Sequence, residues 1–288
     1  MAAAQIFFLR GMQKSGTKWM GNLLNLHPRI LCRGEYHFGV LDDAIKRWHQ
    51  INGLTRSLGE AATQNLTAFI ERSVTSNPSK PDIVWFGDRT PGEIDRGVLP
   101  DAPRIFLLRD GRDILVSRTY HYLRLGLQLP HCSPDVPQIF KAFPALGEKL
   151  ALFSKDPAYF DKHTRDLLDD EHWVRMQARR WQAFINAHDA ILDATADELR
   201  DQRIAKVSYE DIHRAPDRER TRLYGFLGLN ADDARPLDAK TRPGKSERDN
   251  LAAFRSGRVG DWREYFSESV SRWFQEEAGE ALRKSGYE

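Results

Sequence analysis

Four short apolar runs interrupt an otherwise mixed sequence, and each has the length of a buried β-strand. They cover residues 6–9, 83–86, 104–108 and 203–207. Each run is followed by a polar or Gly/Pro-containing turn, and three of them lead toward helical patterns. Alternation of buried strands with helices is typical of a parallel sheet whose crossover helices cover its faces. The pattern therefore predicts an α/β fold.

The clearest helical pattern covers about residues 171–199, where apolar side chains recur every three or four residues. His188 falls within this apolar stripe, and no neighbour has the spacing of a metal site, so we expect a hydrogen-bonded core histidine. Between about 126 and 164 the periodicity gives way to prolines and scattered aromatic residues. A long irregular segment of this kind is typical of a substrate lid. Because no repeat or linker is evident, we expect residues 1–288 to form one domain.

The first apolar run ends in a loop with the composition of an anion site. Residues 10–19 read Arg-Gly-Met-Gln-Lys-Ser-Gly-Thr-Lys-Trp. A strand that ends in a tight turn at a helix N-terminus directs backbone N–H groups and the positive helix dipole at an anion, and Lys14 adds charge. The triphosphate-binding P-loop has Lys-Ser/Thr directly after its second glycine, whereas Gly16 is followed by Thr-Lys. ATP or GTP chemistry is therefore the less favoured use.

Two further segments combine arginine with small residues. Residues 109–117 read Arg-Asp-Gly-Arg-Asp-Ile-Leu-Val-Ser, and a helix that begins near Asp110 would place Arg109 at a strand's carboxyl end. Alone, this segment is equally consistent with an ordinary strand, turn and helix that carries surface arginines. Residues 254–266 read Phe-Arg-Ser-Gly-Arg-Val-Gly-Asp-Trp-Arg-Glu-Tyr-Phe. This second basic loop favours a phosphate site.

Together the segments resemble the sulfotransferases that use 3′-phosphoadenosine-5′-phosphosulfate (PAPS). The family's 5′-phosphosulfate loop is similar to residues 13–19, its 3′-phosphate element to 109–117, and its C-terminal R-x-G-x-x-G-D-W signature to 255–262. Residues 206–211 resemble the family's strand-end segment, whose tyrosine approaches the adenine. The resemblance covers about residues 5–266, and it implies a P-loop-like central parallel β-sheet flanked by helices on both faces.

Carried over by position, the resemblance implies a cofactor site with two phosphate-binding clusters. The residues implied for the 5′-phosphosulfate and the base are Lys14, Ser15, Gly16, Thr17, Lys18, Trp19 and Tyr209. Those implied for the 3′-phosphate are Arg109, Ser117, Arg255, Ser256 and Gly257. Lys14 would also contact the oxygen that bridges phosphorus and sulfur, and Trp19 would stack on adenine. Without the resemblance, the position of Trp19 on an amphipathic helix would favour the core instead. Ser256 stands where cytosolic members often carry lysine.

A general base contributes about 10² to 10⁴ in rate, so the residue that accepts the acceptor's proton should be identifiable. Cytosolic members use a histidine in a K-T-H-x-P-like segment, but residues 87–91 read Gly-Asp-Arg-Thr-Pro. Carbohydrate and protein-tyrosine sulfotransferases place a glutamate after the first helix, and residues 26–38 resemble that segment. The resemblance to this glutamate branch implies Glu35 as the base, with His37 as the alternative or as a group that orients the acceptor, and His121 as a weaker candidate.

Residues 87–91 are also similar to a G-E-K-[S/T]-P segment of the heparan-type members, and Lys18 to a basic residue of theirs. Asp88 and Arg89 are therefore expected to face the acceptor or to hold the site together. Three other basic residues, Arg112, Arg118 and Arg258, are expected to be solvated or structural charges. Trp262 is expected to anchor the C-terminal loop.

Composition and charge narrow the class further. The 288 residues are 41% apolar and carry a formal net charge of +2, which argues against disorder and against nucleic acid or an anionic membrane as the main partner. No stretch reaches the length of a membrane span, and the first residues lack the apolar core of a signal peptide. Cys32 and Cys132 are expected to be free thiols in a reducing cytoplasm. No ligand cluster has the spacing of a metal site.

The sequence thus predicts a PAPS-dependent sulfotransferase that requires no metal. It would move a sulfuryl group in line to a hydroxyl or amine of a carbohydrate, phenol or natural product and release adenosine 3′,5′-bisphosphate (PAP). Two alternatives stay open, a P-loop kinase of small molecules and a nucleotide-binding module that has lost catalysis. No motif identifies the acceptor or the oligomeric state.

Overall fold

The structure is a computed structural model that describes residues 5–53, 60–62, 64–66, 68–69, 72, 82–91, 99, 101–129, 131, 133, 135–195, 200, 203–245 and 254–287. The chain divides into two compact units. The first comprises residues 1–108 and 190–241, and the second comprises residues 109–189 and 242–288. The single domain expected from the sequence stays a prediction.

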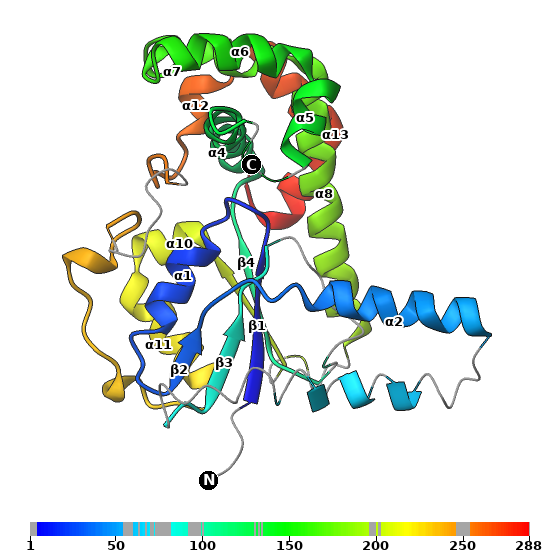
Figure 1. Cartoon of the computed structure of the whole chain (residues 1–288). Helices are drawn as coiled ribbons and strands as arrows, with labels where there is room; N and C mark the ends of the chain where they lie inside the picture. Colours follow the sequence, from blue (N-terminus) through cyan, green and yellow to red (C-terminus); the bar gives the residue numbers. More distant parts are fainter. Residues whose placement is uncertain are drawn as a thin grey trace. The chain divides into compact units, whose positions relative to one another are not determined.

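In the part of the first unit that the structure describes, the strands form a five-stranded parallel sheet (Figure 1). Its strands are β1 (Gln5–Gly11), β2 (Ile30–Cys32), β3 (Trp85–Asp88), β4 (Arg104–Leu108) and β5 (Ile204–Ser208), in the spatial order β2-β3-β1-β4-β5. Strand β1 is central, and its Phe8 is in register with Asp88 on one side and Arg104 on the other. Because all strands are parallel, their carboxyl ends meet at one edge of the sheet, where ligands bind in open α/β sheets.

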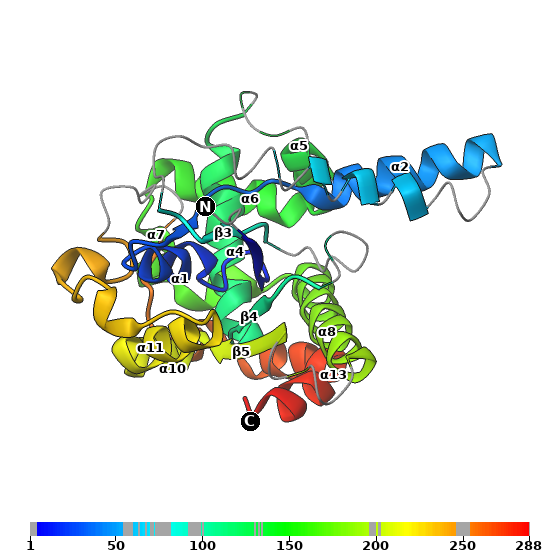
Figure 2. The same cartoon turned by 90° about the horizontal axis from the view of Figure 1, so that it is seen from below.

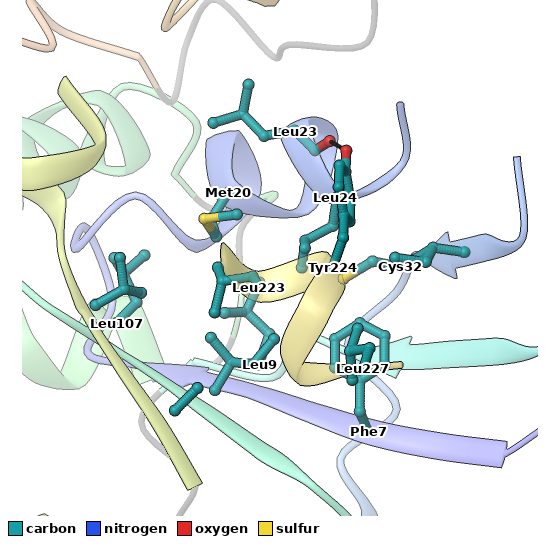
Figure 3. Packing of buried hydrophobic residues seen from close by; sticks show 14 of the residues in the cluster. Phe7, Leu9, Met20, Leu23, Leu24, Cys32, Leu107, Leu223, Tyr224 and Leu227 are labelled. Atoms are coloured by element: carbon teal, nitrogen blue, oxygen red, sulfur yellow. Dashed lines mark hydrogen bonds between the residues drawn. The ribbon is translucent and has the colours of Figure 1, made fainter. Parts of the chain in front are cut away.

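Helices cover both faces of this sheet, as the resemblance implied. Helices of the unit with described bounds include α1 (Thr17–Leu24), α2 (Phe38–Asn52), α10 (Tyr209–Arg214) and α11 (Pro216–Phe226), with 3-10 turns at Ala231–Asp233 and Ala239–Thr241. One core cluster, drawn in Figure 3, joins the sheet to α1, α10 and α11 through residues such as Phe7, Leu9, Met20, Ile212, Leu223 and Tyr224. The other cluster joins it to the start of α2 through residues such as Ile6, Phe8, Phe38 and Phe86.

The alternation of side chains along β1 explains why one strand serves two cores. Phe7 and Leu9 point to the α1 face, and Ile6 and Phe8 point to the α2 face. A strand buried on both faces reads as a continuous apolar run, which is the pattern that predicted it. Figure 1 shows the result, with α1, α10 and α11 on one side of the strands and α2 on the other.

The second unit is helical. Its helices are α4 (Gly111–Gly126), α5 (Asp135–Ala142), α6 (Pro144–Lys155), α7 (Tyr159–Lys162), most of α8 (Glu171–Ala194), α12 (Trp262–Tyr265) and α13 (Glu268–Ser285), with a 3-10 turn at Thr164–Leu168. Helices α8 and α13 lie side by side (Figure 2). Arg175 and Arg179 of α8 both pair with Glu277 of α13, and Trp181 packs against Phe274.

The expectation of an irregular segment at about 126–164 is wrong, because α5, α6 and α7 occupy much of it. Two of the prolines that suggested a loop stand at helix starts: Pro137 lies in the first turn of α5 and Pro144 at the start of α6. Proline is favoured there because the first N–H groups of a helix have no intrahelical partner to lose. A role of this segment as a substrate lid stays a prediction.

Three smaller expectations are confirmed. His188 is fully buried, and its Nδ1 lies 3.1 Å from Oδ1 of Asp189. Cys32 is a buried free thiol, and burial raises its pKa to about 12; Cys132 lies outside the described residues. Helix α4 begins at Gly111, where the Asp110 side chain accepts from the backbone N–H of Arg112. Among the described residues, no helix combines the length and the apolarity that a membrane span needs.

Candidate functional site

The turn between β1 and α1 holds two residues in the left-handed backbone region. Lys14 has a φ of 77°, and Gly16 has a φ of 100°. Gly16 has no room for a side chain, because an added Cβ would lie 2.6 Å from Cδ2 of Tyr209. The left-handed conformation costs a lysine about 1 to 3 kcal/mol, and such strain clusters at functional sites. The fold thus fixes the turn at Gly16 and imposes a strained backbone on the neighbouring lysine.

This turn leaves hydrogen-bond donors at the start of α1. Gly16 is the N-cap and offers no side-chain cap, and the first turn has no acidic residue. Ser15 is fully buried, and among the described residues its Oγ has no hydrogen-bond partner. Its backbone N–H donates to the carbonyl of Met12 at 2.9 Å, so the hydroxyl is the group that Ser15 can offer a ligand. A buried hydroxyl beside an uncapped helix N-terminus is a site that suits an anion.

Trp19 and Tyr209 lie together against this turn. Their rings pack edge to face at 5.4 Å, and Trp19 Nε1 donates to the carbonyl of Thr241 at 2.7 Å. Only 9% of Trp19 and 2% of Tyr209 is exposed, and both belong to the core between the sheet and α1. The structure therefore shows the core role that the helix position of Trp19 favours. The contacts of these two rings with adenine stay a prediction.

Glu35 lies in the segment between β2 and α2, and its side chain is 43% exposed. Its Oε1 is 3.8 Å from Nη1 of Arg89, a loose ion pair. The Arg89 stem packs on Gly21 of α1, where an added Cβ would lie 3.0 Å from Arg89 Cδ. His37, also exposed, has a φ of 51° and directly precedes α2. The structure thus brings the two candidate bases into one short segment and places a guanidinium beside the carboxylate.

In the second unit, the C-terminal loop and α12 contact residues of α4 that lie before and after the predicted Ser117. The backbone N–H groups of Gly260 and Trp262 donate to the carboxylate of Asp113 at 2.9 and 3.0 Å. Further along the helix, Tyr120 contacts the hydroxyl of Tyr265 at 3.2 Å. Ser117 is four residues after Asp113 and therefore lies between these two contacts. The C-terminal loop of the signature thus runs beside the predicted serine.

Two carboxylates hold the predicted arginines of this cluster. Arg109 Nη2 lies 3.7 Å from Asp113 and donates to the carbonyl of Arg258 at 3.0 Å. Arg255 pairs with Asp261, which also accepts from the hydroxyl of Ser256 at 2.9 Å. Burial lowers the pKa of the Arg255 guanidinium. These aspartates orient the two arginines, and they also reduce the positive charge that a phosphate would meet.

The arginine contacts extend to aromatic rings. The guanidinium of Arg255 lies 5.3 Å from the ring centre of Tyr120 and 5.4 Å from that of Tyr265. That of Arg112 lies 3.9 Å over the ring of Trp262 and pairs with Asp110. Trp262 is therefore a structural anchor of the C-terminal loop, as expected.

Sequence reasoning missed Asp113 and Asp261, although each had a signal. Asp113 is one helical turn after Arg109, and Asp261 is the acidic residue of the G-D-W triplet. It also missed that Asp88 binds Arg10 of β1 and the backbone N–H of Tyr36, because these contacts join segments far apart in the sequence. Across the described residues, no group of three metal-binding side chains was found.

Residues 97–286 match the model of the sulfotransferase domain family. This match covers more than half of the 288 residues, and the chain belongs to that family. It includes Arg109, Ser117, Tyr209 and Arg255, and it begins after Lys14 and Glu35. No curated protein matches the sequence.

Solved structures share the fold. The structure of mouse sulfotransferase SULT7A1 complexed with PAP is 18% identical, with a TM-score of 0.51, and the match covers 99% of this chain and 86% of that one. The sulfotransferase domain from the curacin biosynthetic pathway is 13% identical, with a TM-score of 0.51, and the match covers 100% of this chain and 99% of that one. At these identities the likeness shows the fold alone. The five-stranded parallel sheet flanked by helices is the sulfotransferase α/β fold.

Proposed function

We propose that this sulfotransferase uses PAPS and transfers its sulfuryl group to a hydroxyl or amine of an acceptor. The observation that carries the proposal is the turn before α1, where the strained Lys14, the uncapped helix start and the buried hydroxyl of Ser15 meet. These donors suit a phosphosulfate. They lack the Lys-Ser/Thr pair of a triphosphate loop, and together with the family match this leaves little support for a kinase.

The second unit supplies donors of the kind that a 3′-phosphate requires. Arg109 and Arg255 are each oriented by a carboxylate, and Ser117 follows Asp113, the partner of Arg109, by one turn of α4. Gly257, with a φ of 69°, gives the loop a turn next to Ser256. The family match and the donors of the turn between β1 and α1 support a phosphosulfate ligand. We assign PAPS as the cofactor on this basis. When bound, PAPS would supply the sulfuryl group that is transferred.

Three residues of the chain have separate roles in the proposed reaction. Glu35 accepts the proton of the acceptor hydroxyl at a carboxylate oxygen, which makes the acceptor oxygen more nucleophilic. The Lys14 ammonium stabilises negative charge at the start of α1. Arg89, 3.8 Å from Glu35, keeps positive charge beside the carboxylate. The acceptor is a carbohydrate, a phenol or a natural product, and His37 is the alternative base.

The direct test is transfer of labelled sulfate from PAPS to a panel of carbohydrate and phenol acceptors. Wild type is expected to transfer label to at least one acceptor. Lys14→Ala is expected to label none of them at the same concentration of enzyme. Lys14→Arg is the matched control, because it keeps the charge and changes its geometry. Tight binding of PAP without transfer to any acceptor would favour the nucleotide-binding module that has lost catalysis.

A further inference from the structure

A buried polar cluster lies at the carboxyl ends of β1 and β3, on the face that α2 covers. Arg10 Nη2 donates to Asp88 Oδ2 at 2.7 Å, and its Nη1 donates to the Asp88 carbonyl at 3.1 Å. Each of the two side chains is only 1% exposed. Phe8 and Asp88 are register partners, and the Arg10 guanidinium lies 4.4 Å over the Phe8 ring. The two strands therefore fix the position of this carboxylate.

The second oxygen of Asp88 reaches out of the sheet to the segment that carries Glu35. Asp88 Oδ1 accepts from the backbone N–H of Tyr36 at 3.1 Å and from the hydroxyl of Thr90 at 2.9 Å. The Thr90 oxygen in turn accepts from the backbone N–H of His37 at 3.2 Å. Thr90 is fully buried. One carboxylate and one hydroxyl thus bind two consecutive backbone N–H groups.

A third bond holds the other side of Glu35. The backbone N–H of Arg89 donates to the carbonyl of Gly34 at 3.3 Å. The residues before and after Glu35 are therefore bonded to consecutive residues at the end of β3. The Glu35 side chain remains exposed on a backbone that is fastened at both ends. A carboxylate that must meet an acceptor hydroxyl within hydrogen-bond distance needs such a support.

We propose that Asp88 and Thr90 are positioning residues that hold Glu35 in its reactive place, with Arg10 as the buried counter-ion that fixes Asp88. The inference rests on the proposed function and extends it from the base to the device that orients the base. The negative charge of Asp88 is needed for its pair with Arg10. The hydroxyl of Thr90 is needed because it donates to Asp88 and accepts from the backbone N–H of His37.

Thr90→Val tests the proposal without removing a buried charge. Valine has nearly the shape of threonine but leaves the His37 N–H without its acceptor. We expect Thr90→Val to lower kcat about tenfold or more, with KM for PAPS and affinity for PAP within about twofold of wild type. Thr90→Ser, which restores the hydroxyl, is expected to recover most of kcat. Amide hydrogen exchange at His37 should be faster in Thr90→Val than in Thr90→Ser.

A double-mutant cycle separates positioning from a general effect on the fold. In the Glu35→Gln background, Thr90→Val should change kcat by less than about twofold, because the group that it orients is already absent. An equal factor in both backgrounds would show a merely structural role and overturn the inference. If wild type is active and Thr90→Val has the same kcat, the positioning role is overturned but the proposed function is not. Absence of sulfate transfer by wild type would overturn the proposed function as well.

Discussion

Replacing Arg10 with methionine would leave the Asp88 carboxylate buried without its counter-ion. Methionine keeps an unbranched apolar stem against Phe8 but loses the two bonds of 2.7 and 3.1 Å to Asp88. Both side chains are 1% exposed, so water does not reach the carboxylate. Removing one partner of a buried pair costs about 3 to 5 kcal/mol. That loss is a large part of the roughly 5 to 15 kcal/mol by which proteins are stable.

The effect of a second substitution, Asp88→Asn, on the free energy of unfolding should change sign with the residue at position 10. Asp88→Asn removes the charge but keeps an oxygen that can accept from the Tyr36 N–H. In wild type it breaks the pair with Arg10 and destabilises the chain. Added to Arg10→Met, it removes the uncompensated charge and should recover about 1 kcal/mol or more of the lost free energy of unfolding.

The assay is urea unfolding, monitored by tryptophan fluorescence, of wild type, the two single variants and the double variant. Their unfolding midpoints are compared, provided that the dependence of the unfolding free energy on urea is the same in all four. Two results would refute the reasoning. One is a cost of less than about 1 kcal/mol for Arg10→Met, which is the range of an exposed ion pair. The other is an equal destabilisation by Asp88→Asn in both backgrounds.

The remaining predictions concern the two candidate site segments and the buried thiol. Glu35→Gln should cut turnover about 100-fold or more in steady-state kinetics while PAP affinity stays nearly intact; near-normal turnover would move the role of base to His37. Lys14→Ala should lower both PAP affinity and kcat, and unchanged kinetics would remove the loop from the mechanism. Because the raised pKa of about 12 keeps Cys32 protonated until the pH approaches that value, iodoacetamide at about pH 8 should label it only after denaturation. Rapid labelling of Cys32 in the folded chain, assigned by peptide mapping so that Cys132 is not counted with it, would contradict that burial.

The sequence predicted most of the sheet because its central strands are buried on both faces and therefore read as apolar runs. Strand β4 matches its prediction, and β1 and β5 differ only at their ends. Strand β3 begins at Trp85, two residues later than the apolar run suggested. Strand β2 was missed, because Ile30–Cys32 is too short for a period to show and is defined by its pairing with β3.

The candidate site divides in the same way. The glycine turn, the basic loop and the segment that carries Glu35 could each be predicted, because each of them is one continuous stretch of sequence. The bonds that hold that segment were not predictable, since Arg10 meets Asp88 only after β1 and β3 pair, and Tyr36 and His37 lie more than 50 residues before their partners. The helices at 135–162 were hidden because proline was interpreted as a helix breaker, whereas Pro144 stands at a helix start.

Thermal unfolding of wild type with PAP and, separately, with Mg-ATP tests the proposed use of PAPS most directly. At about 100 times its dissociation constant, a ligand that binds only the folded chain stabilises it by roughly 2.7 kcal/mol. We expect that stabilisation with PAP, its loss in Lys14→Ala, and no comparable effect of Mg-ATP. Selective stabilisation by Mg-ATP would contradict the assignment of the β1–α1 turn to a phosphosulfate.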